Sequence, residues 1–419
     1  MAIKSVPWSE SDLSARLCRA LDTARDAAEL FGVAGYRDAD CPENSFLPEK
    51  PISETAMLLY AASAANRLPE VSAKIEEVAR TIAPHARSSR AALQIALHPA
   101  LGLDFAFTHI LLTKLGFGDP CFDDYVKSCL QSQSSYVHER PPFASLEQRW
   151  LESVWTGSAL SSGWNVDLLR SALNGPIDIL GGLRDDAYAF THILMYCTDF
   201  GNQSCQLPRK RSHVMDDASS LLAKCLDDED YDLAAEVLLF WPLTGAPWTA
   251  TASFGFRVLA LVEDRVGILP GGTTNTERLR SLSGLDKTRY RLGTGYHTAI
   301  VMGILCATSL RLGQAPTTNL AGPLVETRFL ERLSCIVDHD RGHWRSPFQN
   351  LSDTEQRTLG PLLLDIAIAQ QYRKRDFEAL REVLALACEY GLAKSPLCRQ
   401  AAGLLERLAH CSRAINPLG

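Results

Sequence analysis

The amino-acid sequence predicts an all-α protein. Almost every periodic segment of the 419 residues repeats its apolar positions at helical spacing, and no segment shows convincing strand alternation. Proline and glycine separate these segments, for example at Gly116–Pro120, Pro270–Gly272 and Gly313–Pro316. The pattern accommodates roughly sixteen to eighteen helices of about 10–18 residues each.

The first expected helix runs from Asp12 to Phe31 and stops at Gly32, a residue type that commonly ends helices. Strongly apolar helices follow at regular intervals, each with a more polar helix after it. They are expected to begin near Glu54, Gly102, Leu146, Asp186, Asp232, Thr294 and Pro361. Most successive starts are roughly 40–48 residues apart, which is the length of one helical hairpin.

Apolar helices that alternate with amphipathic ones predict two concentric layers, with the apolar helices inside. This organisation resembles the (α/α) toroid, or barrel, shared by terpenoid cyclases, protein prenyltransferases, lanthionine cyclases and several glycoside hydrolases. The resemblance implies a single all-helical domain over residues 1–419, built from about six to seven helical hairpins. Residues 1–50 would form an N-terminal helix and connector, and residues 51–419 the toroid. An open α-solenoid of the same hairpins is the alternative.

Motifs of those families do not extend the resemblance to a function. Neither the D-x-D-D acid of the cyclases nor the Cys-His-Gly zinc ligand of the lanthionine cyclases occurs in this sequence. The phosphate-binding loop, the dinucleotide fingerprint and the G-x-S-x-G nucleophile elbow are missing as well. Nucleotide-dependent chemistry and serine hydrolysis are therefore not expected.

Composition narrows the partners and the compartment. A net charge of −7 argues against nucleic acid and against an anionic membrane surface. The twelve cysteines include no C-x-x-C pair, and several lie in apolar helical runs, as reduced thiols do. No apolar run reaches the length of a membrane span. We therefore expect a cytoplasmic protein.

The segment Asp185–Gly201 gives the strongest functional signal. One face of the expected helix carries Asp185, Tyr188, His192, Tyr196 and Asp199, and the opposite face is apolar. Such a stripe, without Lys, Glu, Arg or Gln, is predicted to face a cavity rather than bulk water. The phrase AYAFTHILMYCTDFG within it is similar to a pattern in uncharacterised bacterial helical proteins.

Part of this phrase occurs twice, because AFTHIL is found at residues 106–111 and again at residues 189–194. The repeat places His109 and His192 at matching positions and suggests a duplicated hairpin.

The expected inner helices each offer an isolated polar residue. These residues are Glu54, His109, Glu147, His192, Glu236, His297 and Asp365. For each one the alternative is a helix cap or a satisfied core residue. Glu236 lies in mid-helix among apolar residues, so it requires either a partner or a raised pKa. His297 follows Gly293 and Gly295 and is expected at a helix N-terminus.

These observations predict a biosynthetic enzyme that modifies a small molecule or a peptide. The chemistry would be of cyclase, lyase or hydrolase type, with acid–base catalysis in a central cavity. His192 is the leading acid–base candidate. The other expected catalytic residues are Tyr196, Asp199, Asp185, His109, Glu236 and His297, and the expected substrate contacts are Tyr188, Phe240, Trp241 and Tyr296.

Two other functions fit the same residues. One is a non-catalytic helical scaffold that holds a peptide or a partner protein. The other is a metal-dependent enzyme such as an oxygenase, in which Zn or Fe is bound by imidazoles from separate helices together with a carboxylate such as Asp186 or Glu236. No motif in the sequence requires a cofactor.

Overall fold

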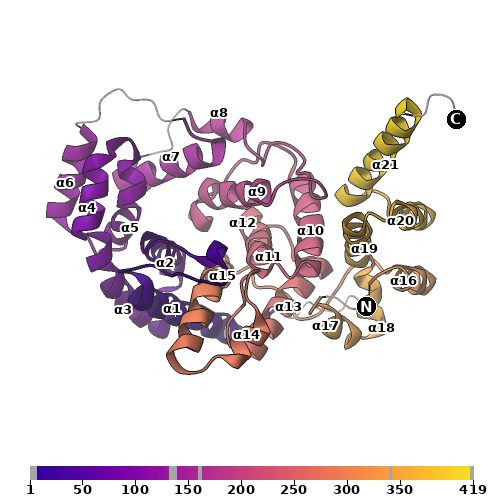
Figure 1. Cartoon of the computed structure of the whole chain (residues 1–419), viewed down its shortest axis with the longest axis horizontal. Helices are drawn as coiled ribbons and strands as arrows, with labels where there is room; N and C mark the ends of the chain where they lie inside the picture. The colour runs from indigo at the N-terminus through magenta and orange to yellow at the C-terminus, as the bar shows by residue number, and fades with distance from the viewer. Residues whose placement is uncertain (1–6, 132–138, 159–162, 339–341, 416–419) are drawn as a thin grey trace.

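The computed structural model describes residues 7–131, 139–158, 163–338 and 342–415 (Figure 1). Within these ranges the regular secondary structure is helical, and β pairing is limited to the isolated bridges Pro7–Thr317 and Tyr36–Phe46. The prediction of an all-α fold is therefore confirmed.

The helices divide into a first group, up to the segment that carries His192, and a second group after it. The first group is α1 (Glu10–Phe31), η1 (Pro42–Asn44), α2 (Glu49–Ala62), η2 (Ser63–Ala65), α3 (Pro69–Ala86), α4 (Ser89–Leu97), η3 (Pro99–Leu101), α5 (Gly102–Lys114), α6 (Pro120–Gln131), α7 (Pro142–Thr156), α8 (Trp164–Leu169), α9 (Arg184–Cys197) and η4 (Asp199–Gly201). The second group is α10 (Arg211–Asp227), α11 (Tyr231–Leu238), α12 (Phe240–Thr244), α13 (Ala250–Val266), α14 (Thr276–Ser281), α15 (Gly284–Leu312), α16 (Thr327–Ser334), α17 (Arg345–Gln349), α18 (Asp353–Thr358), α19 (Gly360–Lys374), α20 (Phe377–Glu389) and α21 (Pro396–Ile415).

Helix α1 shows how local sequence fixes an element. Ser9 caps it, because the Ser9 hydroxyl accepts a hydrogen bond from the Asp12 amide at 3.0 Å and the Asp12 carboxylate accepts one from the Ser9 amide at 3.3 Å. The predicted apolar stripe from Leu13 to Phe31 is buried, and the helix ends at Gly32. The helix predicted over Asp12–Phe31 is thus confirmed, with its start two residues earlier.

Six helices contact one another in a closed cycle. Helix α2 contacts α5, α5 contacts α7, α7 contacts α9, α9 contacts α11, α11 contacts α15, and α15 returns to α2. Helices α1 and α3 pack against this cycle near α2, and α10 and α13 pack against it near α11 (Figure 1). The cycle brings side chains from residues 49 to 312 to one centre. Kinship with the toroid families stays a prediction.

The predicted helix start at Thr294 is wrong. Helix α15 begins ten residues earlier and continues through both glycines of the Gly-Thr-Gly sequence. Gly293 makes room for a neighbour, since a Cβ atom there would lie 2.4 Å from the Tyr36 ring. This glycine therefore serves a close approach between elements and does not end the helix.

Helices α16 to α21 lie together at one side of the molecule (Figure 1). They meet the rest of the chain mainly through α19 and α21, which contact α10. Asp365 on α19 accepts hydrogen bonds there from Ser220 at 2.6 Å and from Ser395 at 2.7 Å. Burial raises the pKa of Asp365 to about 6. The prediction that Asp365 lies on an inner helix beside the other candidates is wrong.

Among the described helices, none is by itself long and apolar enough to cross a membrane. The bent pair Ser89–Leu97 and Pro99–Lys114, whose axes meet at 114°, reaches that length and composition when its two parts are taken together.

Candidate functional site

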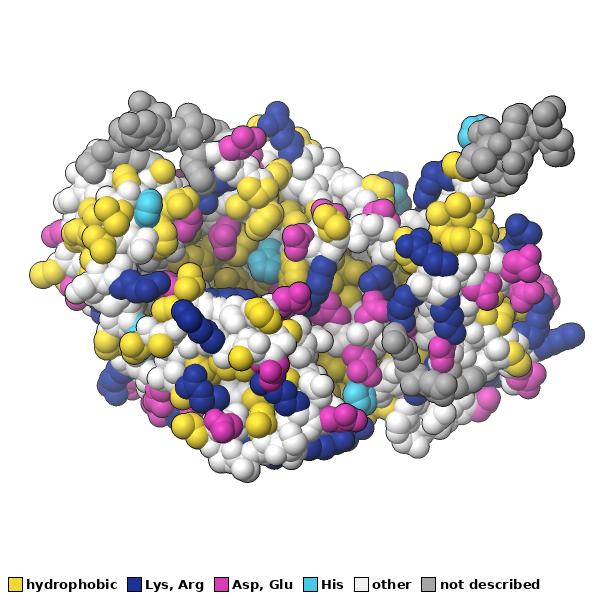
Figure 2. Space-filling view, viewed as in Figure 1, with side chains coloured by type: hydrophobic (Ala, Val, Ile, Leu, Met, Phe, Trp, Pro, Cys, Tyr) yellow, Lys and Arg dark blue, Asp and Glu magenta, His cyan; other side chains and the backbone are white. Residues whose placement is uncertain are grey.

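The six helices of the cycle surround a pocket of about 420 Å³ that all of them line. A second pocket of about 720 Å³ adjoins it, and Phe143, His192 and His297 line both. Figure 2 shows a hollow in this part of the molecule, with a histidine and apolar side chains inside and acidic side chains around it. Volumes of this size suit a small organic ligand.

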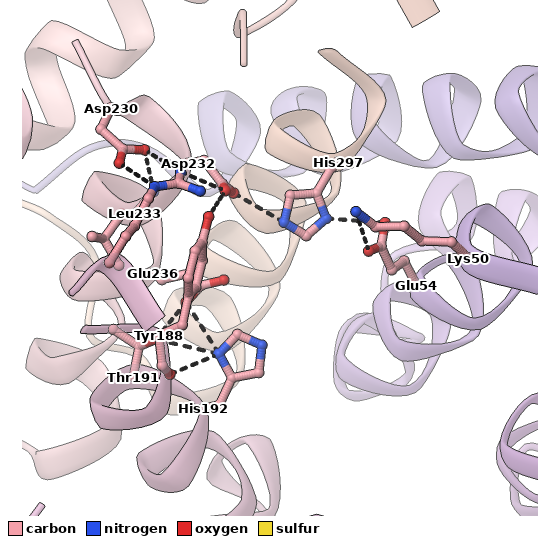
Figure 3. Close-up of polar contacts among 11 residues, drawn as sticks. Lys50, Glu54, Tyr188, Thr191, His192, Asp230, Asp232, Leu233, Glu236 and His297 are labelled. Carbon is pink, nitrogen blue, oxygen red and sulfur yellow. Dashed lines mark hydrogen bonds and ion pairs between the residues drawn. The ribbon is translucent and has the colours of Figure 1, made fainter. Parts of the chain in front are cut away.

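His192, on α9, is held through one ring nitrogen. Its Nδ1 lies 3.0 Å from the Tyr188 carbonyl oxygen and 3.3 Å from Glu236 Oε2. Among the described residues none hydrogen-bonds to Nε2, which lies on the side of the ring away from these contacts (Figure 3), and His192 lines both pockets. The side chain is 26% exposed. Burial favours the neutral ring, but the carboxylate of Glu236 outweighs it and raises the pKa of His192 to about 9.

Glu236, on α11, has the partners that its mid-helix position requires. Its side chain is 2% exposed, and the Thr191 hydroxyl donates a hydrogen bond to the same Oε2 atom that faces His192. Glu236 thereby fixes the orientation of the imidazole.

His297, on α15, lies between two carboxylates. Its Nδ1 is 3.0 Å from Glu54 Oε2 and its Nε2 is 3.1 Å from Asp232 Oδ1 (Figure 3). Both are ion-pair distances without the alignment of a hydrogen bond. Burial opposes the charge, yet the two carboxylates hold the pKa of His297 well above its usual range. The predicted N-terminal position of His297 is wrong, because α15 begins 13 residues before it.

Asp232 was not among the residues predicted for the site. Its Oδ2 accepts hydrogen bonds from the Tyr188 hydroxyl and, at 3.3 Å, from Arg184. Burial raises the pKa of this carboxyl, but His297 and its hydrogen-bond donors outweigh burial and lower it. The available signal was the spacing of Asp232 and Glu236, which puts both carboxylates on one face of a helix.

Glu147, on the neighbouring helix α7, lines the same pocket. The Tyr196 hydroxyl donates a hydrogen bond of 2.5 Å to Glu147 Oε1, and both residues line the pocket. Burial raises the pKa of Glu147, although the Tyr196 hydroxyl opposes the shift. The pocket therefore holds an imidazole and a carboxyl group whose proton affinities both exceed the usual values.

The comparison with protein-family models decides the family. The model of DUF6895, a domain of unknown function, matches residues 17–307. The chain belongs to the DUF6895 family. A search of curated proteins and a search of solved structures found no match. The DUF6895 region runs from α1 into α15 and includes every residue of the site described above, whereas α16 to α21 lie beyond it.

The DUF6895 region also contains predicted site residues that lie away from the pocket. His109 is fully buried, with Nδ1 accepting a hydrogen bond from Arg87 at 3.1 Å and Nε2 lying 3.0 Å from Asp123. Both ring nitrogens are therefore occupied outside the cycle. The prediction that His109 is a cavity partner is wrong.

Asp199 leaves the stripe because α9 ends at Cys197. It adopts a left-handed φ of 47°, and its carboxylate accepts hydrogen bonds from Tyr60 at 2.9 Å and Trp150 at 2.6 Å. This carboxylate ties α2 and α7 to the end of α9. The predicted catalytic role of Asp199 beside His192 does not fit that position.

The remaining predicted residues divide between pocket and core. Asp185, Tyr188 and Tyr296 line the larger pocket, and Tyr196 lines the smaller one. Phe240 stacks on Phe190, and Trp241 stacks on Trp248. The side chains of Phe240 and Trp241 are fully buried. Neither Phe240 nor Trp241 lines the two pockets, so the prediction that they contact substrate is wrong.

Proposed function

We propose that this protein is an enzyme that moves protons to and from a small organic molecule bound in the central pocket. His192 and Glu147 are the acid–base groups, and Glu236 is a positioning residue for His192. The reaction would be an elimination, a cyclisation or a hydrolysis, all of which need such groups.

The geometry of His192 is the observation that carries this proposal. Because Nδ1 is fixed by Glu236 and by a backbone carbonyl, the ring has one orientation, and Nε2 is left facing the pocket. Carboxylate-oriented imidazoles with one exposed nitrogen are the usual arrangement of a general acid or base.

Glu147, on the neighbouring helix α7, supports the proposal. A carboxyl group with a raised pKa exchanges protons nearer to neutral pH than an ordinary carboxylate does. Tyr196 fixes its orientation through the hydrogen bond at 2.5 Å. Two proton-exchanging groups on neighbouring helices of one pocket allow one to donate while the other accepts.

The lining favours a ligand with a polar and an apolar part. Acidic side chains from several helices and Arg140 supply polar contacts, and Met57, Phe107 and Ile300 supply an apolar wall. A pocket of about 420 Å³ holds a small molecule more readily than a folded partner. We therefore favour a small-molecule substrate over a peptide.

Metabolite conversion by the purified chain tests the proposal. The protein is incubated with a small-molecule extract in ²H₂O, and mass spectrometry follows compounds that disappear, appear or gain deuterium. We expect wild type to convert at least one compound, and His192→Gln to lower the rate about 10²–10⁴-fold. His213→Gln, an exposed histidine at the start of α10, is the control. Equal conversion by wild type and His192→Gln, or a ligand that binds and is released unchanged, would contradict the proposal and favour a binding scaffold.

A further inference from the structure

Three side chains meet between α11 and α15, beside His192. Asp232 and Glu236 project from one face of α11, and His297 projects from α15. One ligand atom from each lies within 4.8 Å of the other two. Ligand atoms that each lie about 2.0–2.2 Å from one metal ion are separated from one another by comparable distances.

Each carboxylate has one anchored oxygen, and Asp232 also has a buried oxygen that no hydrogen bond holds. The anchored oxygen of Asp232 is bound by Tyr188 and Arg184, and that of Glu236 is bound by Thr191. Asp232 Oδ1 is buried and accepts no hydrogen bond, and it lies 3.1 Å from His297 Nε2. Because the Asp232 side chain is 7% exposed, leaving this oxygen without a hydrogen bond is costly unless a cation stabilises it.

His297 is oriented as a metal-binding histidine usually is. Its Nδ1 faces the Glu54 carboxylate, which leaves Nε2 directed toward Asp232 of α11 (Figure 3). Histidine ligands commonly pair their second nitrogen with a carboxylate, which fixes the tautomer and the ring. Glu54 supplies that group here.

We propose that Asp232, Glu236 and His297 bind one divalent transition-metal cation, with Glu54 positioning His297. Two carboxylates and one imidazole suit Mn²⁺, Fe²⁺ or Zn²⁺ better than Ca²⁺, which takes oxygen ligands alone. The remaining coordination positions would open toward the larger pocket, which both Asp232 and His297 line. The site would supply a Lewis acid next to the proposed proton-transfer groups.

Metal uptake is measured without any substrate. The full chain is freed of metal by chelation and dialysis, and Mn²⁺ alone is added, because Mn²⁺ avoids the thiols of the twelve cysteines. Calorimetry and elemental analysis are expected to give one equivalent per chain and a rise in the unfolding temperature. Asp232→Asn and Glu236→Gln should each raise the Kd at least tenfold, and Glu54→Gln should raise it about 10–100-fold.

Circular dichroism of each variant confirms that it is folded, and His213→Gln is the control that should bind as wild type does. Uptake below about a tenth of an equivalent by wild type, or equal affinity in wild type and Glu236→Gln, would overturn the metal site. Neither result bears on His192 as an acid–base group, so failure of the metal proposal is distinguishable from failure of the proposed function.

Discussion

His109 and His192 occupy the same place in the same six-residue phrase, yet only His192 reaches the pocket. His109 points toward α6 and the end of α3, where Asp123 and Arg87 use both of its nitrogens. The periodicity of a helix assigns residues to faces, but the neighbours of each face are set by contacts distant in sequence. The phrase therefore identifies two inner helices without identifying which histidine serves the site.

Glu147 gives a testable prediction about a single residue. Burial makes the folded state hold the Glu147 proton more tightly than the unfolded state does, so stability falls as the pH rises above the ordinary carboxyl range. Glu147→Gln cannot ionise and still accepts the Tyr196 hydrogen bond. We expect it to raise the unfolding temperature at pH 7 while lowering turnover at least 10²-fold, as calorimetry and the conversion assay would show.

The pH dependence of this rise in unfolding temperature tests whether it comes from the ionisation of Glu147. At about pH 4 and below, where both states are protonated, Glu147→Gln and wild type should unfold at the same temperature. Glu152→Gln, an exposed position on the same helix, should change neither stability nor turnover. A Glu147→Gln protein less stable than wild type at pH 7 would show that Glu147 is an ordinary ionised partner.

At the scale of helices, periodicity and capping predict most elements. The apolar stripe of α1 and the glycine after it predict the bounds of this helix within two residues. The apolar runs identify the helices of the cycle. Helix α15 is the exception, because Gly293 and Gly295 appear in the sequence as breaks. A glycine that ends a helix and one that admits a neighbouring ring have the same local sequence, and only the packing distinguishes them.

Gly303 tests this account of α15. It lies where α15 meets α1 and α2, and a Cβ atom there would be 2.6 Å from the Ala20 Cβ and 2.8 Å from Leu58 Cδ1. Alanine gains about 1 kcal/mol of helix propensity over glycine, but the forced separation of three helices outweighs it. We expect Gly303→Ala to lower the free energy of unfolding by about 1–3 kcal/mol in urea titrations.

The control for that substitution is Gly175→Ala. Gly175 has open space around its Cβ position and an ordinary φ, so this change should stay within about 0.5 kcal/mol of wild type. A Gly303→Ala protein as stable as wild type would mean that the three helices separate easily.

For the molecule as a whole, the site exists only because the cycle closes. Its ionisable groups come from α2, α7, α9, α11 and α15, which span most of the DUF6895 region. The sequence predicts that these helices are apolar and that each offers a polar residue. It does not predict the rotation of each helix, which is why Asp232 was missed and why Phe240 and Trp241 were misplaced. That information resides in contacts between segments far apart in the chain.

One such contact is the buried ion pair that joins the first helix to α13. Arg16 on α1 pairs with Glu263, both side chains being 6% exposed, and also with Asp264, which is 51% exposed. Glu263→Leu leaves the Arg16 charge buried with only a solvated partner, and we expect a loss of about 3 kcal/mol in urea unfolding. Asp264→Asn removes only a screened contact and should cost less than about 1 kcal/mol.

The double variant Arg16→Met with Glu263→Leu distinguishes a charge effect from a packing effect. The Glu263→Leu variant loses stability either because a buried charge is uncompensated or because packing changes. If the uncompensated charge is the cause, replacing both partners by apolar side chains of similar size should recover most of the lost stability. If the pair instead holds α1 in register through its hydrogen bonds, the double variant should be at least as unstable as Glu263→Leu alone. We expect recovery, because the apolar stripe of α1 from Leu13 to Phe31 already fixes its packing against α15.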